Sequence, residues 1–486
     1  MTKKRYIVAN RFGPGLSQRA HQQLQSFVAS TKDAALGKRT SVGRQVVYMT
    51  HDHMRDLAAK NRDLVVEEDR ELTLFPMPGL PPVISLGDHF ARTVHVKDAT
   101  TGAPIPYVTI YGIGTGPAYK AETDPQGGAT LVTNEASLVR LIASPRDTYW
   151  SRVIEGVSMT DENVLDITLK PLLVTGAYSW GHRLMGFRSV SSRWTGRSVK
   201  IGIIDSGISD RLQDLKPTGG YNTLDGQDSN AWQVDEKGHG THCAGIVAAL
   251  NNTIGVRGGA PGAAIYSLKV FPGGYVSDLV EAIEWCVRNR MDIMSMSLGS
   301  PVPSQVLAGA LYDAYIRGVT CIAAVGNERT RVAYPAGFPT VIGVSALGRF
   351  GTFPEDSAHH LKIGSYVDWR GELFAANFTN FGPEVEVCAP GVAMLSTVPT
   401  GYASWDGTSF SCPLVSALAA LILEAYPLIR TGDTQQPEFV RAILRSAATD
   451  LGLPRPIQGY GLPLVPYAFA AAERYGLRGA QSPMWG

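Results

Sequence analysis

The sequence predicts an α/β protein whose main domain is built on a doubly wound, mainly parallel sheet, with two smaller domains before it. Three observations carry this prediction. Residues 173–486 alternate short, continuous apolar runs with helical patterns, as strands buried on both faces of a parallel sheet require. Residues 1–76 interleave strand and helix patterns, and residues 83–172 alternate apolar and polar side chains between turn motifs. A chain of 486 residues is long enough for all three domains.

The first domain, residues 1–76, has the pattern of a small α+β unit. Strand-like runs alternate with two stretches whose apolar residues recur at helical spacing. The strand-like runs are residues 5–10, 45–49 and 63–68, and the helical stretches are residues 18–30 and 51–61. Strands and helices in this succession favour a ferredoxin-like arrangement.

The second domain follows a stiff, proline-rich linker at residues 77–82. Its strand-like segments alternate apolar and polar residues at 92–98, 107–112 and 164–170. Gly- and Pro-containing turns such as TTGAP lie between them. No catalytic constellation occurs in residues 83–172, so a small β-sandwich that serves as a spacer or binding module is the preferred interpretation.

The third domain, residues 173–486, carries the α/β signal. Four fully apolar runs are expected as neighbouring buried strands. They are residues 199–205, 264–270, 292–298 and 319–325. Helical patterns lie between or after them, so the active groups are expected at the carboxyl ends of the strands.

The composition is that of a globular protein without a strongly charged partner. Hydrophobic residues make up 44%, charged residues 18%, and the formal net charge is +1. This balance gives no reason to expect nucleic acid as a partner, and no apolar run approaches the roughly 20 residues that span a bilayer. The basic start MTKKRYIVAN lacks an apolar stretch behind it, so no secretory signal is expected and the compartment stays open. The five cysteines, without a CxxC motif, are typical of reduced, buried thiols.

Four polar residues stand where such a domain places its chemistry. Asp205 ends an apolar strand, Asn327 follows another, and His239 and Ser409 each stand at the start of a helical pattern. A hydroxyl nucleophile needs a base to take its proton, a carboxylate to orient that base, and a donor aimed at the developing oxyanion. Asp, His, Ser and Asn supply these four roles.

Together, the motifs DSG, HGTH, SLG, GN and GTS resemble a subtilisin-type serine peptidase over residues 178–475. The resemblance implies a subtilisin-like fold for this domain, Asp205, His239 and Ser409 as the catalytic triad, and the Asn327 side-chain amide with the Ser409 backbone N–H as the oxyanion hole. It also decides between the three interpretations of GHGTHCAG at residues 238–245, namely a metal site, a thiol catalyst or a base, in favour of His239 as the base. His242 is then expected to make a buried structural hydrogen bond, and Cys243, one helical turn on, to lie beneath the base.

Two stretches depart from the family pattern. Phe410 to Leu414 replace the residues that usually follow the nucleophile, and altered packing with a second buried thiol is expected there. Residues 348–374 are an insertion where the family usually has a short connection. This insertion is expected to be a surface loop, with His359 and His360 facing solvent.

The resemblance also implies a substrate cleft in which a peptide binds as an added strand. One edge is expected at Ser297, Leu298 and Gly299, and the other at Gly274 and its neighbours. A P1 pocket is expected to be walled from Ala324 to Gly326, floored near Ala333 and rimmed by Glu328. Val276, Leu279 and Leu298 favour an apolar P4 pocket.

The stretch LNNTIGVRGGAP at residues 250–261 resembles the family's calcium loop. The resemblance implies a structural Ca²⁺ held by the side chain of Asn252 and by three backbone carbonyls, with Asp214 as the carboxylate. The carbonyls belong to Leu250, Ile254 and Val256. Calcium takes six to eight oxygen ligands, and a glutamine that the family usually adds has no match around Thr175. A metal-free turn is the alternative.

Residues 1–76 resemble the family's inhibitory propeptide, most clearly at VVEEDRELTLF. The resemblance implies an intramolecular inhibitor whose tail enters the cleft with Phe75 at P1. Pro76 follows directly; it lacks an N–H and has a fixed φ, so cleavage after Phe75 is expected to be resisted.

The leading hypothesis is therefore an autoinhibited serine endopeptidase that acts on proteins or peptides through an acyl-enzyme. A leader-peptide processing protease or peptide ligase that uses the same acyl-enzyme is the alternative within this chemistry. A catalytically silent interaction protein is the alternative outside it, and an intact set of four catalytic groups argues against that.

Overall fold

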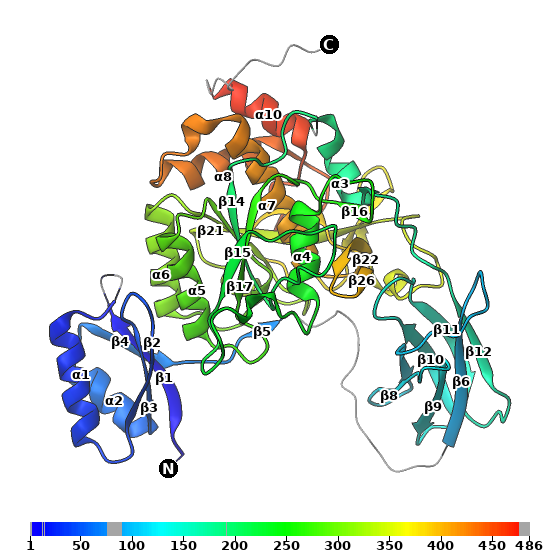
Figure 1. Ribbon diagram of the computed structural model, residues 1–486, viewed down its shortest axis with the longest axis horizontal. Coiled ribbons are helices and arrows are strands. Elements are labelled where there is room, and N and C mark those ends of the chain that lie inside the picture. The colour runs from blue at the N-terminus through cyan, green and yellow to red at the C-terminus, as the bar shows by residue number, and fades with distance from the viewer. Residues whose placement is uncertain (1, 12, 14, 75–89, 191, 476–486) are drawn as a thin grey trace.

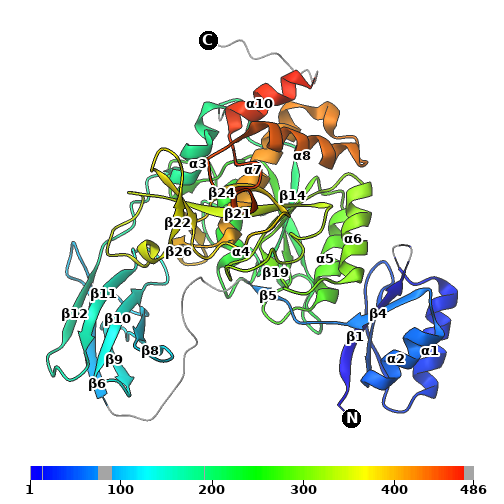
Figure 2. The same ribbon diagram turned by 180° about the vertical axis from the view of Figure 1, so that it is seen from behind.

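The computed structural model describes all residues except 1, 12, 14, 75–89, 191 and 476–486. Three bodies are visible: an N-terminal domain, a β-rich module and, between them, a large α/β domain (Figures 1 and 2). Phe75, Pro76 and the linker at 77–82, singled out in the sequence, lie outside the described residues.

The N-terminal domain packs two helices on a four-stranded antiparallel sheet of order β2-β3-β1-β4. Its elements are β1 Lys4–Asn10, α1 Gln18–Ser30, β2 Ala35–Arg39, β3 Gln45–Met49, α2 His51–Lys60 and β4 Leu64–Glu68. Alternate residues of β1 and β3 join Leu24 and Leu57 of the helices in one apolar core. A short strand, β5 (Thr73–Leu74), leaves this domain and pairs elsewhere.

The β-rich module consists of two small sheets that enclose one apolar cluster. One sheet has the order β11-β10-β7-β8 and the other β12-β6-β9. Their strands are β6 Phe90–Asp98, β7 Thr109–Ile113, β8 Tyr119–Glu122, β9 Gly128–Thr133, β10 Ser137–Ser144, β11 Arg152–Ser158 and β12 Leu165–Leu169.

The α/β domain is built on a nine-stranded sheet, in which the predicted apolar runs form parallel neighbours. The order is β15-β17-β14-β18-β20-β21-β23-β22, and β24 also pairs with β21. The strands are β14 Lys200–Asp205, β15 Gly219–Asn222, β17 Ala264–Lys269, β18 Ile293–Met296, β20 Thr320–Ala324, β21 Val341–Arg349, β22 Ile363–Val367, β23 Leu373–Ala376 and β24 Val385–Pro390. The predicted α/β class with a mostly parallel sheet is confirmed.

Helices cover both faces of this sheet. Helices α4 (His239–Ala248) and α7 (Thr408–Ala425) share one apolar cluster with it, and α5 (Val276–Arg288) and α6 (Gln305–Ile316) share another. The other elements are α3 Trp180–Met185, α8 Gln435–Ala447, α9 Arg455–Gln458, α10 Val465–Arg474 and the strands β13 Ala177–Tyr178, β16 Val256–Arg257, β19 Leu298–Gly299, β25 Met394–Val398, β26 Gly401–Trp405, β27 Ala448–Thr449 and β28 Leu462–Pro463.

The insertion at residues 348–374 was expected to be a surface loop, and that expectation is wrong. It contains the short 3₁₀ helix Ala358–Lys362, strand β22 and the start of β23. Strand β23 pairs antiparallel with β21, and β22 pairs antiparallel with β23, so the two strands extend the main sheet. Phe374 at its end is completely buried in an apolar cluster with Phe378 and Val392. Phe374, together with the partly buried Phe353 and Ile363, thus packs in a core that is assembled from distant parts of the chain.

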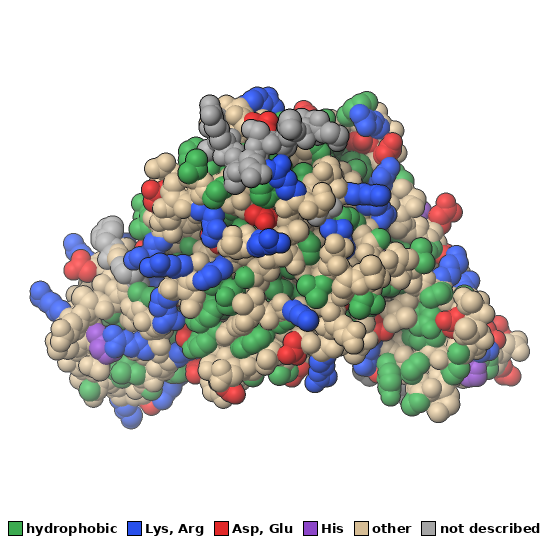
Figure 3. Space-filling view, turned by 45° about the horizontal axis from the view of Figure 1, so that its top comes forward, with side chains coloured by type: hydrophobic (Ala, Val, Ile, Leu, Met, Phe, Trp, Pro, Cys, Tyr) green, Lys and Arg blue, Asp and Glu red, His purple; other side chains and the backbone are tan. Residues whose placement is uncertain are grey.

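One described helix, α7, is long and apolar enough to cross a membrane, but 94% of it is buried inside the protein. It is the central helix of the α/β domain, which explains its composition. On the face shown in Figure 3, several basic side chains lie close together, and acidic ones are scattered, while the formal net charge of the whole chain is +1.

Candidate active site

The four residues predicted to carry chemistry converge at one edge of the main sheet. Asp205 is the last residue of β14, and Asn327 comes three residues after the end of β20. His239 begins α4, and Ser409 is the second residue of α7. Because parallel strands end on the same side of a sheet, residues far apart in sequence meet there.

The imidazole of His239 is held by Asp205. Its Nδ1 lies 2.8 Å from Asp205 Oδ1 and 3.0 Å from Oδ2, and both residues are buried. Burial alone would lower the pKa of His239, but the adjacent Asp205 carboxylate and the more distant Asp235 favour the charged ring, so its pKa lies above the usual value. With Nδ1 donating to the carboxylate, Nε2 is the nitrogen that can accept a proton.

Asp235 is a functional neighbour that sequence reasoning missed. Its carboxylate accepts hydrogen bonds from Ser206 Oγ and the Gly238 N–H at 2.8 Å and from Thr241 N and Oγ1 at 2.9 and 2.6 Å. These bonds tie the turn that precedes His239 to the residue that follows Asp205. A carboxylate four residues before the histidine was the available signal.

Ser409 lies at the N-terminus of α7, where unpaired backbone N–H groups favour developing negative charge. Its Oγ lies 3.4 Å from the Ser297 carbonyl oxygen, and Ser297 Oγ donates to the Ser409 carbonyl at 2.8 Å. Ser409 is therefore hydrogen-bonded to Ser297, the residue directly before β19 and part of the predicted edge of the cleft.

Asn327 is oriented by Thr408. Its Oδ1 accepts hydrogen bonds from the Thr408 N–H at 2.9 Å and from Thr408 Oγ1 at 2.8 Å. The backbone N–H can only donate, so the oxygen of the amide must face Thr408 and the donor end must face the other way. That donor, Nδ2, lies beside Gly407, in the turn that leads to Ser409.

The other two chemical groups of GHGTHCAG lie where the sequence placed them. His242 is completely buried, donates from Nε2 to the Ala403 carbonyl at 3.1 Å and has a pKa lowered by burial to about 3, so it stays neutral. Cys243 Sγ lies 3.8 Å from His239 Nδ1 and donates to the Ser409 carbonyl at 3.4 Å. Burial holds the pKa of this thiol well above its usual value, so it is a poor nucleophile.

His359 was expected to face solvent, and this expectation is wrong. It is 4% exposed, and its Nδ1 lies 2.7 Å from Oδ1 of the buried Asp406, three residues before Ser409. Its burial depends on packing against Trp150, about 200 residues earlier, which no local sequence pattern reveals. His360 is exposed, as expected.

A segment of the chain itself lies in the predicted substrate cleft. Strand β5 pairs antiparallel with β19, with Leu74 opposite Leu298 and Thr73 opposite Gly299. On the other side, the Leu72 N–H donates to the Gly274 carbonyl at 2.8 Å. An extended segment thus joins both edges as a middle strand, which is how a peptide substrate would bind.

The residues predicted for the side-chain pockets lie around this segment. Leu72 is buried in the same apolar cluster as Val276, Leu279 and Leu298. The Glu328 carboxylate lies close to Gly326. It accepts hydrogen bonds from the Asn327 N–H at 2.9 Å and from Asn380 Nδ2 at 3.0 Å. Ala333 is buried, and its N–H donates to the Val325 carbonyl at 2.9 Å, between Ala324 and Gly326.

The predicted calcium loop is hydrogen-bonded to Asp214. Asp214 Oδ2 accepts the Val256 N–H at 2.8 Å, and the Leu250 N–H donates to the Asp214 carbonyl at 2.8 Å. Asn252 Oδ1 accepts the Ile254 N–H at 3.2 Å. Asp214 Oδ1 is buried and accepts no hydrogen bond from the described residues, and burial raises the pKa of this carboxyl group. A buried carboxylate oxygen without a hydrogen-bond donor among the described residues fits a calcium ion.

Comparison with known proteins agrees with this geometry. The model of the subtilase family matches residues 196–462, which include all four converging residues. Subtilisin DY of Bacillus licheniformis is 39% identical over 268 residues, 53% of this chain and 86% of that protein. A subtilisin of Bacillus pumilus is 38% identical over 271 residues, 54% of this chain and 88% of that protein.

The minor extracellular protease Epr of Bacillus subtilis (strain 168) is 33% identical over a longer stretch of 336 residues, 66% of this chain and 45% of Epr. The family match covers more than half of the chain, and it lies over the strands and helices that position the site. The chain therefore belongs to the subtilase family and is a subtilisin-type serine endopeptidase.

Proposed function

We propose that the protein cleaves peptide bonds through Ser409 as nucleophile, His239 as general base and Asp205 as the carboxylate that orients the base. The observation that carries this proposal is the 2.8 Å contact between His239 Nδ1 and Asp205, at the edge of the sheet where α7 presents Ser409. It leaves Nε2 of the ring to take the hydroxyl proton.

In this mechanism Ser409 Oγ attacks the scissile carbonyl while His239 accepts the proton, and Asp205 stabilises the imidazolium that forms. The Asn327 amide and the Ser409 backbone N–H bind the oxyanion of the tetrahedral intermediate. His239 then gives its proton to the leaving amine, and water resolves the acyl-enzyme by the same steps in reverse.

Casein hydrolysis combined with a fluorophosphonate probe tests this proposal. The purified protein is expected to degrade casein, and the probe is expected to stop it by adding to the peptide that contains Ser409, as mass spectrometry would locate. A probe adduct elsewhere, or casein degradation that survives full labelling of Ser409, would contradict the assignment.

We further propose that the N-terminal domain is an intramolecular inhibitor whose tail fills the cleft in the manner of a substrate. In that register Leu72 provides the P4 side chain in the apolar pocket, and Phe75, the residue after Leu74, is the P1 residue. The Ala333 floor suits a large apolar P1 side chain, and Glu328 at the rim would also admit lysine.

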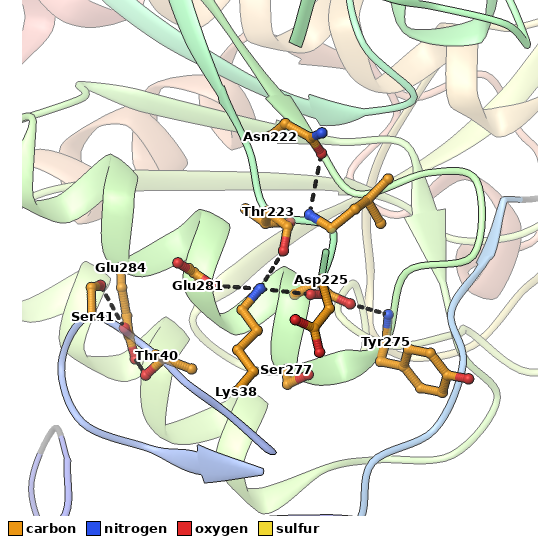
Figure 4. Close-up of polar contacts among 12 residues, drawn as sticks. Lys38, Thr40, Ser41, Asn222, Thr223, Asp225, Tyr275, Ser277, Glu281 and Glu284 are labelled. Carbon is orange, nitrogen blue, oxygen red and sulfur yellow. Dashed lines mark hydrogen bonds and ion pairs between the residues drawn. The ribbon is translucent and has the colours of Figure 1, made fainter. Parts of the chain in front are cut away.

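Polar contacts between the N-terminal domain and helix α5 support this role (Figure 4). Lys38 Nζ donates to Asp278 Oδ1 at 2.8 Å, lies 2.5 Å from Glu281 Oε2 and also bonds the Thr223 carbonyl. Thr40 and Ser41 donate to Glu284 at 3.1 and 3.0 Å. Separating a buried charge pair such as Lys38 and Asp278 would leave a charge buried without its partner. These pairs therefore hold the N-terminal domain against helix α5 in one orientation.

Replacing Lys38 with alanine is expected to weaken the inhibition. Losing one partner of a buried interfacial charge pair costs about 2 kcal/mol or more, so the initial rate on a short chromogenic peptide should rise by roughly tenfold or more. Lys60→Ala is the matched control, since Lys60 forms an exposed pair with Asp56 within its own domain. An unchanged rate in Lys38→Ala would argue against inhibition by the docked domain.

We also propose a structural Ca²⁺ site at Asp214. The ion would be held by the Asp214 carboxylate, the Asn252 side chain and the carbonyls of Leu250, Ile254 and Val256. Bound there, Ca²⁺ would neutralise a buried carboxylate and cross-link the loop to the segment after β14. The unpaired Asp214 Oδ1 supports this assignment.

Calcium is expected to raise the melting temperature of the protein, and a chelator to lower it. A ligand that binds only the folded state stabilises it by about 2.7 kcal/mol at a concentration a hundredfold above its Kd. Asp214→Ala should abolish the response, whereas Asp210→Ala, which removes a nearby exposed carboxylate, should preserve it. A wild-type melting temperature that does not respond to calcium would exclude the site.

Mercurial reagents are expected to inhibit the enzyme through Cys243. A mercury atom on Sγ would occupy the space within 3.8 Å of His239 Nδ1 and displace the base. Cys243→Ala should be active and resistant, whereas Cys286→Ala, which removes another completely buried thiol, should stay sensitive. Equal sensitivity of Cys243→Ala would place the responsible thiol elsewhere.

A further inference from the structure

The turn that carries Ser409 is anchored by a buried carboxylate with no role in the proposed chemistry. Asp406 Oδ1 accepts a hydrogen bond from the Ala393 N–H at 2.8 Å and lies 2.7 Å from His359 Nδ1. The N–H of Gly407, the next residue, donates to the Gly391 carbonyl at 2.8 Å. Asp406 is 8% exposed. The segment from Asp406 to Ser409 is thus fastened to the loop after β24 and to the insertion.

His359 is the side-chain donor to this carboxylate. It lies in the 3₁₀ helix Ala358–Lys362 of the insertion, and Lys362 in the same helix is also buried. The hydrogen bond from His359 and the nearby Lys362 favour the ionised form of Asp406, so the pKa of Asp406 lies below its usual value despite its burial.

The β-rich module holds His359 in place. The Trp150 ring meets the His359 ring edge to face, with centroids 5.5 Å apart, and packs against the apolar cluster that contains Ala393. Two hydrogen bonds of residues near Trp150 join the module to the insertion. The Val153 N–H donates to the Asp356 carbonyl at 2.6 Å, and the Ser151 Oγ accepts the Ala358 N–H at 3.1 Å.

The same module also contacts the hairpin that leads into the nucleophile turn. The Thr148 N–H donates to the Tyr402 carbonyl at 2.7 Å, and Thr400 Oγ1 donates to Asp147. Strand β26 ends at Trp405, directly before Asp406, and the Trp405 ring stacks on His242, three residues after His239 in α4. The module therefore contacts both the hairpin that precedes Asp406 and the insertion that donates to Asp406.

From this arrangement we propose that Asp406 is a positioning residue for Ser409, and that the β-rich module acts through Trp150 and His359 to keep Asp406 in place. The module then contributes to catalysis by supporting the position of Ser409, and it is not a spacer. The proposal rests on Ser409 being the nucleophile, as proposed above. Misplacing a reacting group by about 1 Å can cost about a hundredfold in rate, so a fault in this turn should lower kcat without weakening substrate binding.

The test uses the full-length protein with the N-terminal state of each variant checked by intact mass. Competent sites are counted with the fluorophosphonate probe, and kcat per labelled site is measured on a short chromogenic peptide that fills only P4 to P1. Asp406→Ala is expected to lower kcat by about tenfold to a hundredfold, with KM within about threefold of wild type. Asp406→Asn keeps an oxygen that accepts both hydrogen bonds, and should stay within about threefold in kcat.

Two further variants change the residues that hold Asp406 in place, first His359 and then Trp150. His359→Phe keeps the aromatic packing but loses the donor, and Trp150→Ala removes the packing; each should lower kcat per labelled site by several-fold. Trp369→Ala is the matched control, since Trp369 belongs to the same insertion but is 67% exposed, and its kcat should not change.

A purely structural role predicts a lower melting temperature with unchanged kcat per labelled site in Asp406→Ala, and that result would overturn the proposal. If Asp406→Ala does not fold, unchanged kcat in both His359→Phe and Trp150→Ala would overturn it equally. Failure of the probe to label Ser409 in the wild-type protein would instead contradict the proposed nucleophile, so the two failures are distinguishable.

Discussion

Replacing Ser409 or His239 with alanine is expected to lower kcat by about a millionfold, and the double variant should be hardly worse than either single one. The two side chains transfer one proton between them, so loss of either leaves nothing for the other to do. The measurement is single-turnover and steady-state hydrolysis of a short peptide substrate, with the N-terminal domain in the same state in all variants.

The pH dependence provides an independent check on His239. Only the neutral imidazole can accept the Ser409 proton, and the Asp205 carboxylate raises the pKa of His239. Activity should therefore fall as the pH drops through a value above the usual 6.5 of histidine. His242, with a pKa of about 3, stays neutral across that range and cannot account for the loss of activity at low pH.

A residual rate within tenfold of wild type in either Ser409→Ala or His239→Ala would contradict the triad.

The parts of the structure that the sequence predicted are those with a local signal. The continuous apolar runs around Ile203 and Ile322 form buried parallel strands. Such a run places apolar side chains on both faces of the sheet, and both faces are shielded from water only in the interior of the domain. Strand β2 was missed because its sequence, ALGKR, has neither alternation nor apolar character. It becomes a strand only because β3 offers it an edge to pair with.

The candidate site also has residues with a local sequence signal and residues without one. Asp205, His239, Asn327 and Ser409 stand at strand ends and helix starts, where short motifs mark them, whereas the partners that hold the site do not. The burial of His359 depends on Trp150 in another domain, and only the folded chain brings the two rings together. Lys38 and Asp278 are likewise 240 residues apart.

Replacing Asn327 with alanine is expected to lower kcat by about 10²–10³ while KM stays within about threefold. The amide donor is directed toward a charge that exists only in the tetrahedral intermediate, so its loss weakens the transition state and leaves the bound substrate alone. The Oδ1 hydrogen bonds to Thr408, at 2.9 and 2.8 Å, fix which end of the amide is the donor.

Asn327→Asp is the sharper variant, because it keeps the size of the side chain and an oxygen for Thr408 but replaces the donor with negative charge. Its kcat should fall at least as far as that of Asn327→Ala, since a carboxylate repels the oxyanion that the amide would stabilise. A melting curve for each variant checks that it is folded, since Asn327→Ala also removes the two hydrogen bonds to Thr408. A rise in KM with unchanged kcat would mean that Asn327 binds the substrate in its ground state, and the oxyanion donor would then have to be sought elsewhere.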